Sequence, residues 1–80
     1  MNKKSLQNYI QEISCLLIDN AKKAKIDADN PKEGESSDYN TGFLMAYHEV
    51  IAIMKNQAPF FRLDQRDIGL GDIEPERDLL

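Results

Sequence analysis

The residue types that most often transfer protons, attack substrates or bind metals are scarce in this chain, which has one histidine, His48, and one cysteine, Cys15. In a helical pattern His48 shares a polar arc with Thr41, Ala52 and Lys55. The Glu-x-x-His spacing by which helical bundles hold metal ions is absent around it. The pattern therefore favours a surface histidine with neither a catalytic nor a metal-binding role.

Cys15 stands in the middle of a helical pattern, next to Ser14 and Leu16. A thiol in mid-helix lacks the helix N-terminus that lowers thiol pKa values, and a nucleophile also needs a base beside it. We therefore expect Cys15 to be a small packed side chain without reactivity.

The acidic and glycine-containing segments match no ligand-binding motif. The acids of loop 27–37 do not follow the order of a calcium loop, and 69–71 lacks the third glycine of a dinucleotide loop. Four acids alternate near the C-terminus and would share one side of an extended arm: Asp72, Glu74, Glu76 and Asp78. The default is a solvated face, and the alternative is a surface for a basic partner. We predict no catalytic residue, no cofactor and no metal.

Two long helical patterns are available to position these groups. From Ser5 to Ala28, apolar residues recur every three or four positions, and either Asn2 or Ser5 suits the N-cap. From Asp38 to Ala58 a second pattern follows, with Ser36 or Ser37 as its cap. The loop between them carries proline and glycine, so the two helices should form an antiparallel hairpin.

Gly42 lies inside the second helical pattern, where glycine costs roughly 0.8–1 kcal/mol relative to alanine. Close approach of another backbone near Ala46 and Ile53 would explain it. Tolerance of glycine in the first turns of a helix is the alternative, and the sequence leaves both open.

Pro59 ends the second helix, so residues 1–58 form the hairpin and residues 59–80 a C-terminal arm. The arm has a possible short helix over 60–67 and a possible last turn that begins at Pro75. It also carries too many large apolar residues for a solvated tail. We expect it to be ordered and to lie across the helices of its own hairpin or of a partner chain.

A chain of 80 residues rarely buries enough apolar surface for comfortable stability. One cysteine makes no internal disulfide, so self-association is the remaining remedy. The predicted fold is all-α: an antiparallel two-helix hairpin with an ordered C-terminal arm, paired into a four-helix-bundle homodimer. The candidate interface comprises Tyr39, Phe43, Tyr47, Val50, Met54, Cys15, Ile18, Ile26, Phe60 and Phe61. We expect a charge at Val50 or Phe43 to unfold the chain, and changes at Lys55 to do little.

Charge and hydropathy exclude several classes of function. The net charge is −4, which disfavours binding to nucleic acid. No apolar run is long enough to span a bilayer, and the N-terminus does not match an export signal, so we expect a cytoplasmic protein that does not bind membranes. The leading hypothesis is a non-catalytic protein–protein interaction module. The alternatives are an immunity- or antitoxin-type inhibitor of a basic toxic enzyme and a binder of a small apolar ligand.

Overall fold

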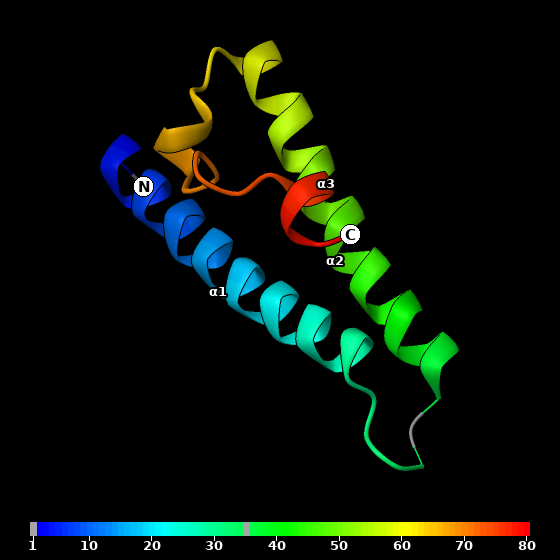
Figure 1. Cartoon of the computed structure of the whole chain (residues 1–80). Coiled ribbons are helices and arrows are strands. Elements are labelled where there is room, and N and C mark those ends of the chain that lie inside the picture. Colours follow the sequence, from blue (N-terminus) through cyan, green and yellow to red (C-terminus); the bar gives the residue numbers. More distant parts are fainter. Residues whose placement is uncertain (1, 35) are drawn as a thin grey trace.

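The computed structural model describes residues 2–34 and 36–80, which contain helices and turns but no strand (Figure 1). The order of elements is α1 (Lys3–Asp29), α2 (Ser37–Gln57), the 3₁₀ turn η1 (Ala58–Phe61), the 3₁₀ turn η2 (Gln65–Ile68) and the single-turn helix α3 (Pro75–Asp78). The all-α prediction and the helical hairpin are therefore confirmed.

Polar caps fix where the two long helices begin. The side chain of Asn2 accepts a hydrogen bond of 2.7 Å from the backbone N–H of Ser5, so α1 starts two residues before the predicted Ser5. The hydroxyl of Ser36 accepts one of 3.2 Å from the N–H of Tyr39 at the start of α2. Of the two candidate caps for each helix, Asn2 or Ser5 and Ser36 or Ser37, the structure uses the first.

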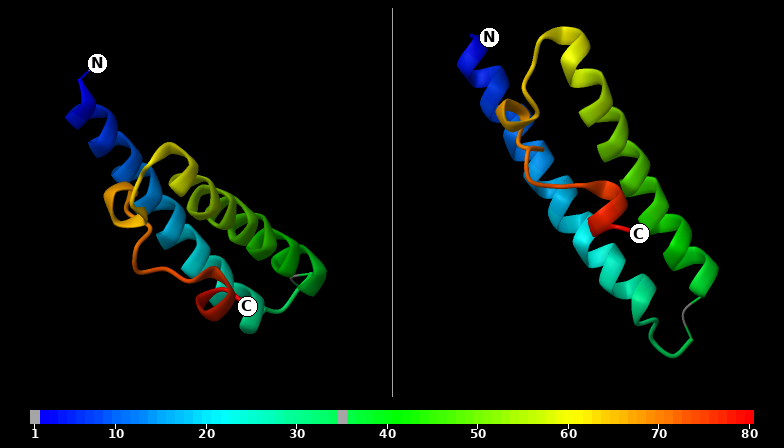
Figure 2. Two further views of the ribbon diagram at one scale, coloured as in Figure 1. Left: turned by 90° about the horizontal axis from the view of Figure 1, so that it is seen from above. Right: turned by 45° about the horizontal axis from the view of Figure 1, so that its top comes forward.

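Proline sets where the helices end. α1 stops at Asp29, because Pro31 disfavours helical backbone at Asn30. Beyond α2, Pro59 supplies no N–H, and the chain tightens into η1. α1 and α2 run antiparallel along the length of the molecule, which measures 47 × 21 × 16 Å (Figures 1 and 2). Within the described residues, no helix has the length and hydropathy needed to cross a membrane.

The C-terminal arm turns back and runs along one side of its own hairpin, with η2 against α1 and α3 against α2 (Figure 2). The predicted helix over 60–67 is wrong. Arg62 adopts a left-handed backbone with φ of 59°, and the N–H of Leu63 bonds to the carbonyl of Ala58, so the chain leaves the helical path after one turn. The predicted last turn at Pro75 is confirmed as α3.

The hydrophobic core lies between the hairpin and this arm. α1 contributes only alanines to its fully buried part, and the arm contributes larger side chains. The buried apolar residues are Ala21, Ala24, Leu44, Ile51, Ala58, Ile68, Leu70, Ile73 and Leu79. Small side chains on α1 leave room for the arm, whose leucines and isoleucines fill the space between the helices.

The arm packs closely against α1 at Gly69. Its φ is +81°, and a Cβ there would lie 3.2 Å from the Cβ of Ser14 and 3.4 Å from the backbone of Gln11, so both backbone conformation and space favour glycine. The side-chain amide of Gln11 donates a 3.0 Å hydrogen bond to the carbonyl of Asp67 beside it. This crossing fixes how the arm lies on α1.

We predict that Leu70→Ala destabilises the chain by about 2–5 kcal/mol, because it opens a cavity where a fully buried side chain now fills the core. Leu80→Ala is the matched control, since that leucine is 56% exposed, and its effect should stay within about 0.5 kcal/mol. Urea unfolding followed by circular dichroism measures both. Equal effects of the two substitutions would show that the arm does not form part of the core.

Candidate functional site

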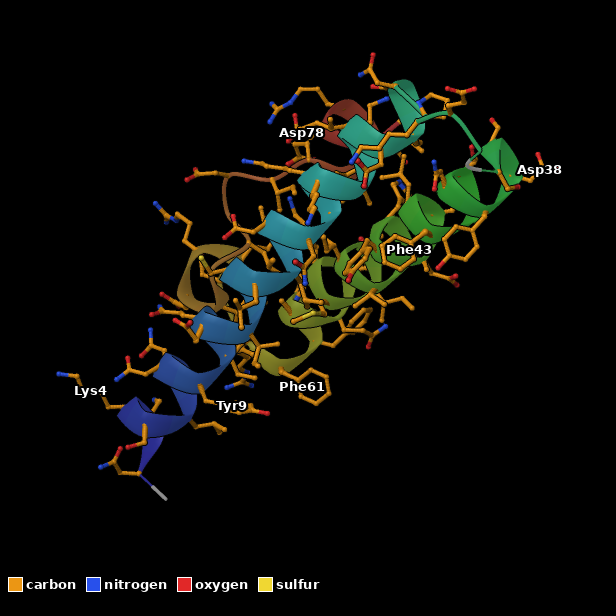
Figure 3. The ribbon with its side chains drawn as sticks, turned by 90° about the horizontal axis from the view of Figure 1, so that it is seen from below. Lys4, Tyr9, Asp38, Phe43, Phe61 and Asp78 are labelled. Carbon is orange, nitrogen blue, oxygen red and sulfur yellow. The ribbon has the colours of Figure 1, made fainter. Side chains whose placement is uncertain are left out.

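The hairpin has two sides, and the arm covers only one. The other side, here called the open face, carries apolar side chains from both helices and from η1: Tyr9, Leu16, Leu17, Phe43, Ala46, Tyr47, Val50 and Phe61. Figure 3 shows Tyr9, Phe43 and Phe61 on the side of the hairpin away from the arm. Leu16 lies seven residues from Tyr9 and therefore on the same side of α1.

Aromatic rings form a row along α2 at the open face. Tyr39 and Phe43 stack with ring centroids 6.1 Å apart, and Phe43 and Tyr47 form a T-shaped pair with centroids 5.3 Å apart. The exposed fractions of Tyr39 and Phe43 are 68% and 47%. Contacts between neighbours on one helix hold these rings in place. The row is thus ordered before anything binds to it.

A shallow hollow of about 210 Å³ opens beside this row, lined by Leu17, Phe43, Ala46, Tyr47 and Val50. Its volume is below the roughly 300–1,000 Å³ of sites that enclose small molecules. A neighbouring hollow of about 310 Å³ is bordered by charged Lys23 and Asp27 as well as by Phe43. Both are surface depressions, suited to a protruding side chain.

The solvent-accessible surface of the chain is larger than its mass predicts. It measures 5993 Å², whereas a compact monomer of 9.1 kDa should expose about 4,900 Å². The excess of about 1,100 Å² is close to the roughly 800 Å² that each partner buries in a standard protein interface. The elongated hairpin with one bare side accounts for this excess.

The structure brings part of the predicted interface together. Phe43, Tyr47 and Val50 line one hollow, with Tyr39 stacked on Phe43 at its edge. Phe61 lies on the same side of the hairpin (Figure 3). The remaining members from this half of the chain are Met54, half-buried against the core, and Phe60, which is 79% exposed.

The second stripe on α1 does not join the open face. Ile18 packs against the core that includes the arm, whereas Cys15 and Ile26 are exposed. Cys15 is therefore not the packed side chain that its mid-helix position suggested. The arm crosses α1 at Gly69 against Ser14 and leaves the neighbouring Cys15 exposed.

The polar arc of α2 is covered by the arm. Lys55, expected at the surface, is 6% exposed, and His48 is half-buried with a fully enclosed Nε2 that has no hydrogen-bond partner among the described residues. Both border a groove of about 480 Å³ between α2 and the arm, which Asn56, Gln65 and Arg77 also line. The placement of His48 and Lys55 at the surface was wrong because the sequence does not show which side the arm covers.

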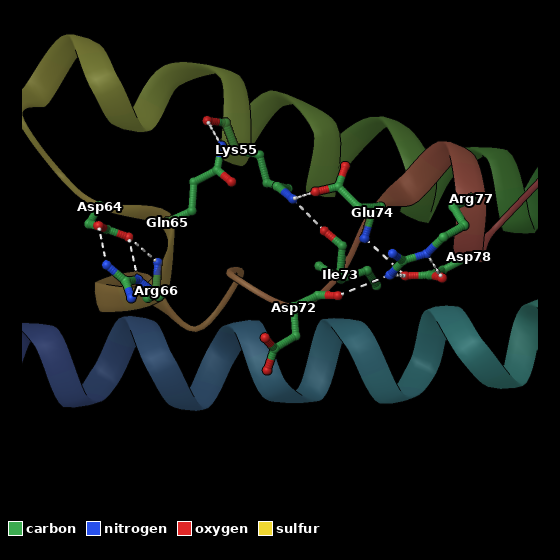
Figure 4. A network of polar contacts seen from close by, with 9 residues as sticks. All are labelled: Lys55, Asp64, Gln65, Arg66, Asp72, Ile73, Glu74, Arg77 and Asp78. Atoms are coloured by element: carbon green, nitrogen blue, oxygen red, sulfur yellow. Dashed lines mark hydrogen bonds and ion pairs between the residues drawn. The ribbon is translucent and has the colours of Figure 1, made fainter.

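Lys55 connects the arm to α2 (Figure 4). Its ammonium donates to the carbonyl of Ile73 and, at 3.0 Å, to the carboxylate of Glu74, while Gln65 donates a 3.2 Å hydrogen bond to the Lys55 carbonyl. A signal for this burial was present, because Lys55 follows Leu44 and Ile51 on one helical line.

The acids of the arm do not form the single acidic side that their alternation suggested. Asp78 accepts hydrogen bonds from Arg77 at 2.7 and 2.9 Å and caps the N–H of Glu74, while Asp64 pairs with Arg66. The α3 turn breaks the extended geometry that the alternation needs. Arg77 and the Glu74 N–H lower the pKa of Asp78 to about 2.

Across residues 2–34 and 36–80, no group of three or more His, Cys, Asp or Glu side chains is placed to hold a metal ion. Comparison of the chain with protein-family models, with curated proteins and with solved structures found no match. The open face and the groove beneath the arm are the surfaces that its own geometry offers.

We predict that Lys55→Ala lowers the free energy of unfolding by about 1–3 kcal/mol, because the buried carbonyl of Ile73 loses its donor. Lys23→Ala, at an exposed position of α1, is the control and should change little. Urea unfolding compares the two. Equal stability of both variants would contradict the burial of Lys55 and support an exposed side chain, as its place on the polar arc of α2 suggested.

We predict that the stability of the fold depends on pH in the acid range through the carboxylate of Asp78. Its folded-state pKa lies below the ordinary value of 3.8, so its stabilising effect is complete above that value and is lost as pH falls towards 2. In Asp78→Asn, melting temperature should fall less between pH 4 and pH 2 than in the wild type. Differential scanning fluorimetry at several pH values measures this, and parallel curves for the two proteins would contradict it.

Proposed function

We propose that the protein is a non-catalytic protein–protein interaction module and that its open face binds a second copy, which yields a four-helix-bundle homodimer. In this arrangement each hairpin supplies two helices and keeps its own arm on the outer side. The proposal places the function in the surface that the arm leaves bare. It keeps the cytoplasm as the expected location.

The observation that carries the proposal is the apolar surface left on the hairpin. The hollow of about 210 Å³ is lined by aliphatic and aromatic side chains, and two of them, Phe43 and Val50, are 47% and 43% exposed. Monomeric proteins seldom leave so continuous an apolar surface without a partner. Burial of the excess of about 1,100 Å² would match what one copy contributes to a stable dimer.

A second copy fits this face better than a basic protein does. The charge of −4 would favour a basic partner through acidic side chains, yet the hollow is lined by apolar residues. Asp64 and Asp78 are paired with arginines, and Glu74 with Lys55, so half of the six acids in the arm already face a cation. Two copies of the same apolar face can instead pack together without needing opposite charges on the two partners.

The binder of a small apolar ligand gains less support. It requires an enclosed cavity among the aromatic rings, whereas the hollow at Phe43 and Tyr47 is open and holds about 210 Å³. The sequence suggested such a site among Tyr39, Phe43, Tyr47 and Phe60, and Phe60 does not line the hollow. The inhibitor of a basic enzyme remains a prediction from small size, acidity and the lack of recognisable catalytic groups in the sequence.

We predict that the wild type has a mass of about 18 kDa by light scattering at micromolar concentration, twice the 9.1 kDa of one chain. Val50→Glu should shift this mass towards the monomer, because a carboxylate in an apolar interface loses its hydration. Because Val50 and Phe43 are so exposed in a single chain, charges there should break the dimer, which replaces the expectation that they unfold the chain.

Ile26→Glu is the matched control, since it places the same charge at an isoleucine that is 61% exposed on α1 and is not part of the open face. It should leave the dimer intact. Circular dichroism checks that both variants stay helical, and Phe43→Ser replaces Val50→Glu if the latter unfolds. A wild type that is monomeric up to millimolar concentration would refute the proposed function.

A further inference from the structure

We infer that two copies pair antiparallel through α2, with the two-fold axis of the dimer passing at Ala46. This inference rests on the proposed function, since it names the residues of α2 through which the second copy binds: Ala46 and Val50 of the open face, and exposed neighbours of these two on the same helix. It starts from the outer arc of α2, defined as Tyr39, Gly42, Ala46, Val50 and Ile53, all of which are exposed.

The spacing of the outer arc is the same in both directions. Its successive steps are three, four, four and three residues, with Ala46 at the centre. An antiparallel partner presents the same helix read backwards, so only a register centred on Ala46 aligns all five positions. Any other register leaves an apolar residue at one end of the arc without a counterpart.

This register also pairs side chains of suitable size. Ala46 meets the partner's Ala46 on the axis, Gly42 faces the partner's Val50, and Tyr39 faces the partner's Ile53. Small residues lie where two crossing helices come closest, and larger ones lie towards the ends. The hollow of about 210 Å³ beside Ala46 provides the space that a side chain of the partner can enter.

The pairing supplies a reason for glycine at position 42. Apart from the adjacent backbone of α2 itself, no atom of the described residues lies within 4 Å of the Cβ that another residue would place there, so packing within one chain does not require glycine. Glycine inside a helix is unfavourable without such a requirement. In the proposed dimer Gly42 faces the partner's Val50, and the absence of a side chain at Gly42 lets the two backbones approach each other. Of the two explanations for this glycine, the pairing therefore favours close approach of another backbone over tolerance in the first turns of a helix.

Charge is compatible with the same register. Glu49 is the acidic residue nearest the arc, three positions from the axis. The two Glu49 side chains therefore start about 9 Å apart along the helix direction and sit at the rim, where water screens them. A register centred on residue 49 itself would place the two carboxylates directly opposite each other.

Disulfide trapping tests the axis. In a Cys15→Ser background, which removes the exposed native thiol, Ala46→Cys should form a covalent dimer under mild oxidation, because a residue on the axis meets its own copy. Ile53→Cys is the control. Its two copies would lie about 21 Å apart along the helices, beyond the roughly 7 Å between Cα atoms that a disulfide tolerates.

Each outcome separates this inference from the proposed function. A trapped Ala46→Cys dimer with an untrapped Ile53→Cys supports the axis. A dimer by light scattering in which Ala46→Cys is not trapped, or Ile53→Cys is, overturns the axis and leaves the proposed function standing. A wild type that is monomeric overturns both.

Gly42→Phe provides a second measurement that does not depend on oxidation. The space around Gly42 in a single chain accepts a side chain, so helicity should be unchanged. The dissociation constant of the dimer, measured by analytical ultracentrifugation, should rise at least tenfold. Unchanged dissociation would contradict a close contact at this position.

Discussion

The structure depends on the space that the two long helices leave between them. The fully buried apolar residues of α1 are small, Ala21 and Ala24, whereas α2 buries Leu44 and Ile51, and the larger Ile10, Leu17 and Ile18 of α1 are only partly buried against this core. Two helices with such a pairing cannot by themselves bury enough apolar surface for a stable fold. The C-terminal arm provides the missing volume with Leu70 and other large residues, so it forms a structural part of the fold.

Because the arm packs on one side of the hairpin, side chains on that side are buried and side chains on the other side stay exposed. On the covered side, polar groups of α2 become buried, and the ammonium of Lys55 finds a carbonyl and a carboxylate from the arm. On the bare side, Phe43, Val50 and their neighbours remain in contact with water. A single packing event therefore creates the interior of the monomer and leaves the surface through which we propose that it self-associates.

Few polar contacts are needed to hold the arm, and most come from side chains of the helices. The amide of Gln11 reaches the carbonyl of Asp67, and the ammonium of Lys25 reaches that of Leu80 at 3.1 Å. These bonds satisfy backbone groups that an irregular segment cannot pair within itself. Apolar burial supplies most of the stability, and the hydrogen bonds define where along the hairpin the arm lies.

The sequence by itself determined the elements that depend on neighbouring residues: the two helices from their periodicity, two candidate caps for the start of each, and the break at Pro59. Only the tertiary structure decided which side of the hairpin the arm covers, and hence that Lys55 is buried and Cys15 exposed. The reason is physical. Helix periodicity and caps act within a few residues, whereas α1 and α2 each carry apolar residues on two sides, and the fit of the arm against alanine-lined space selects one of them.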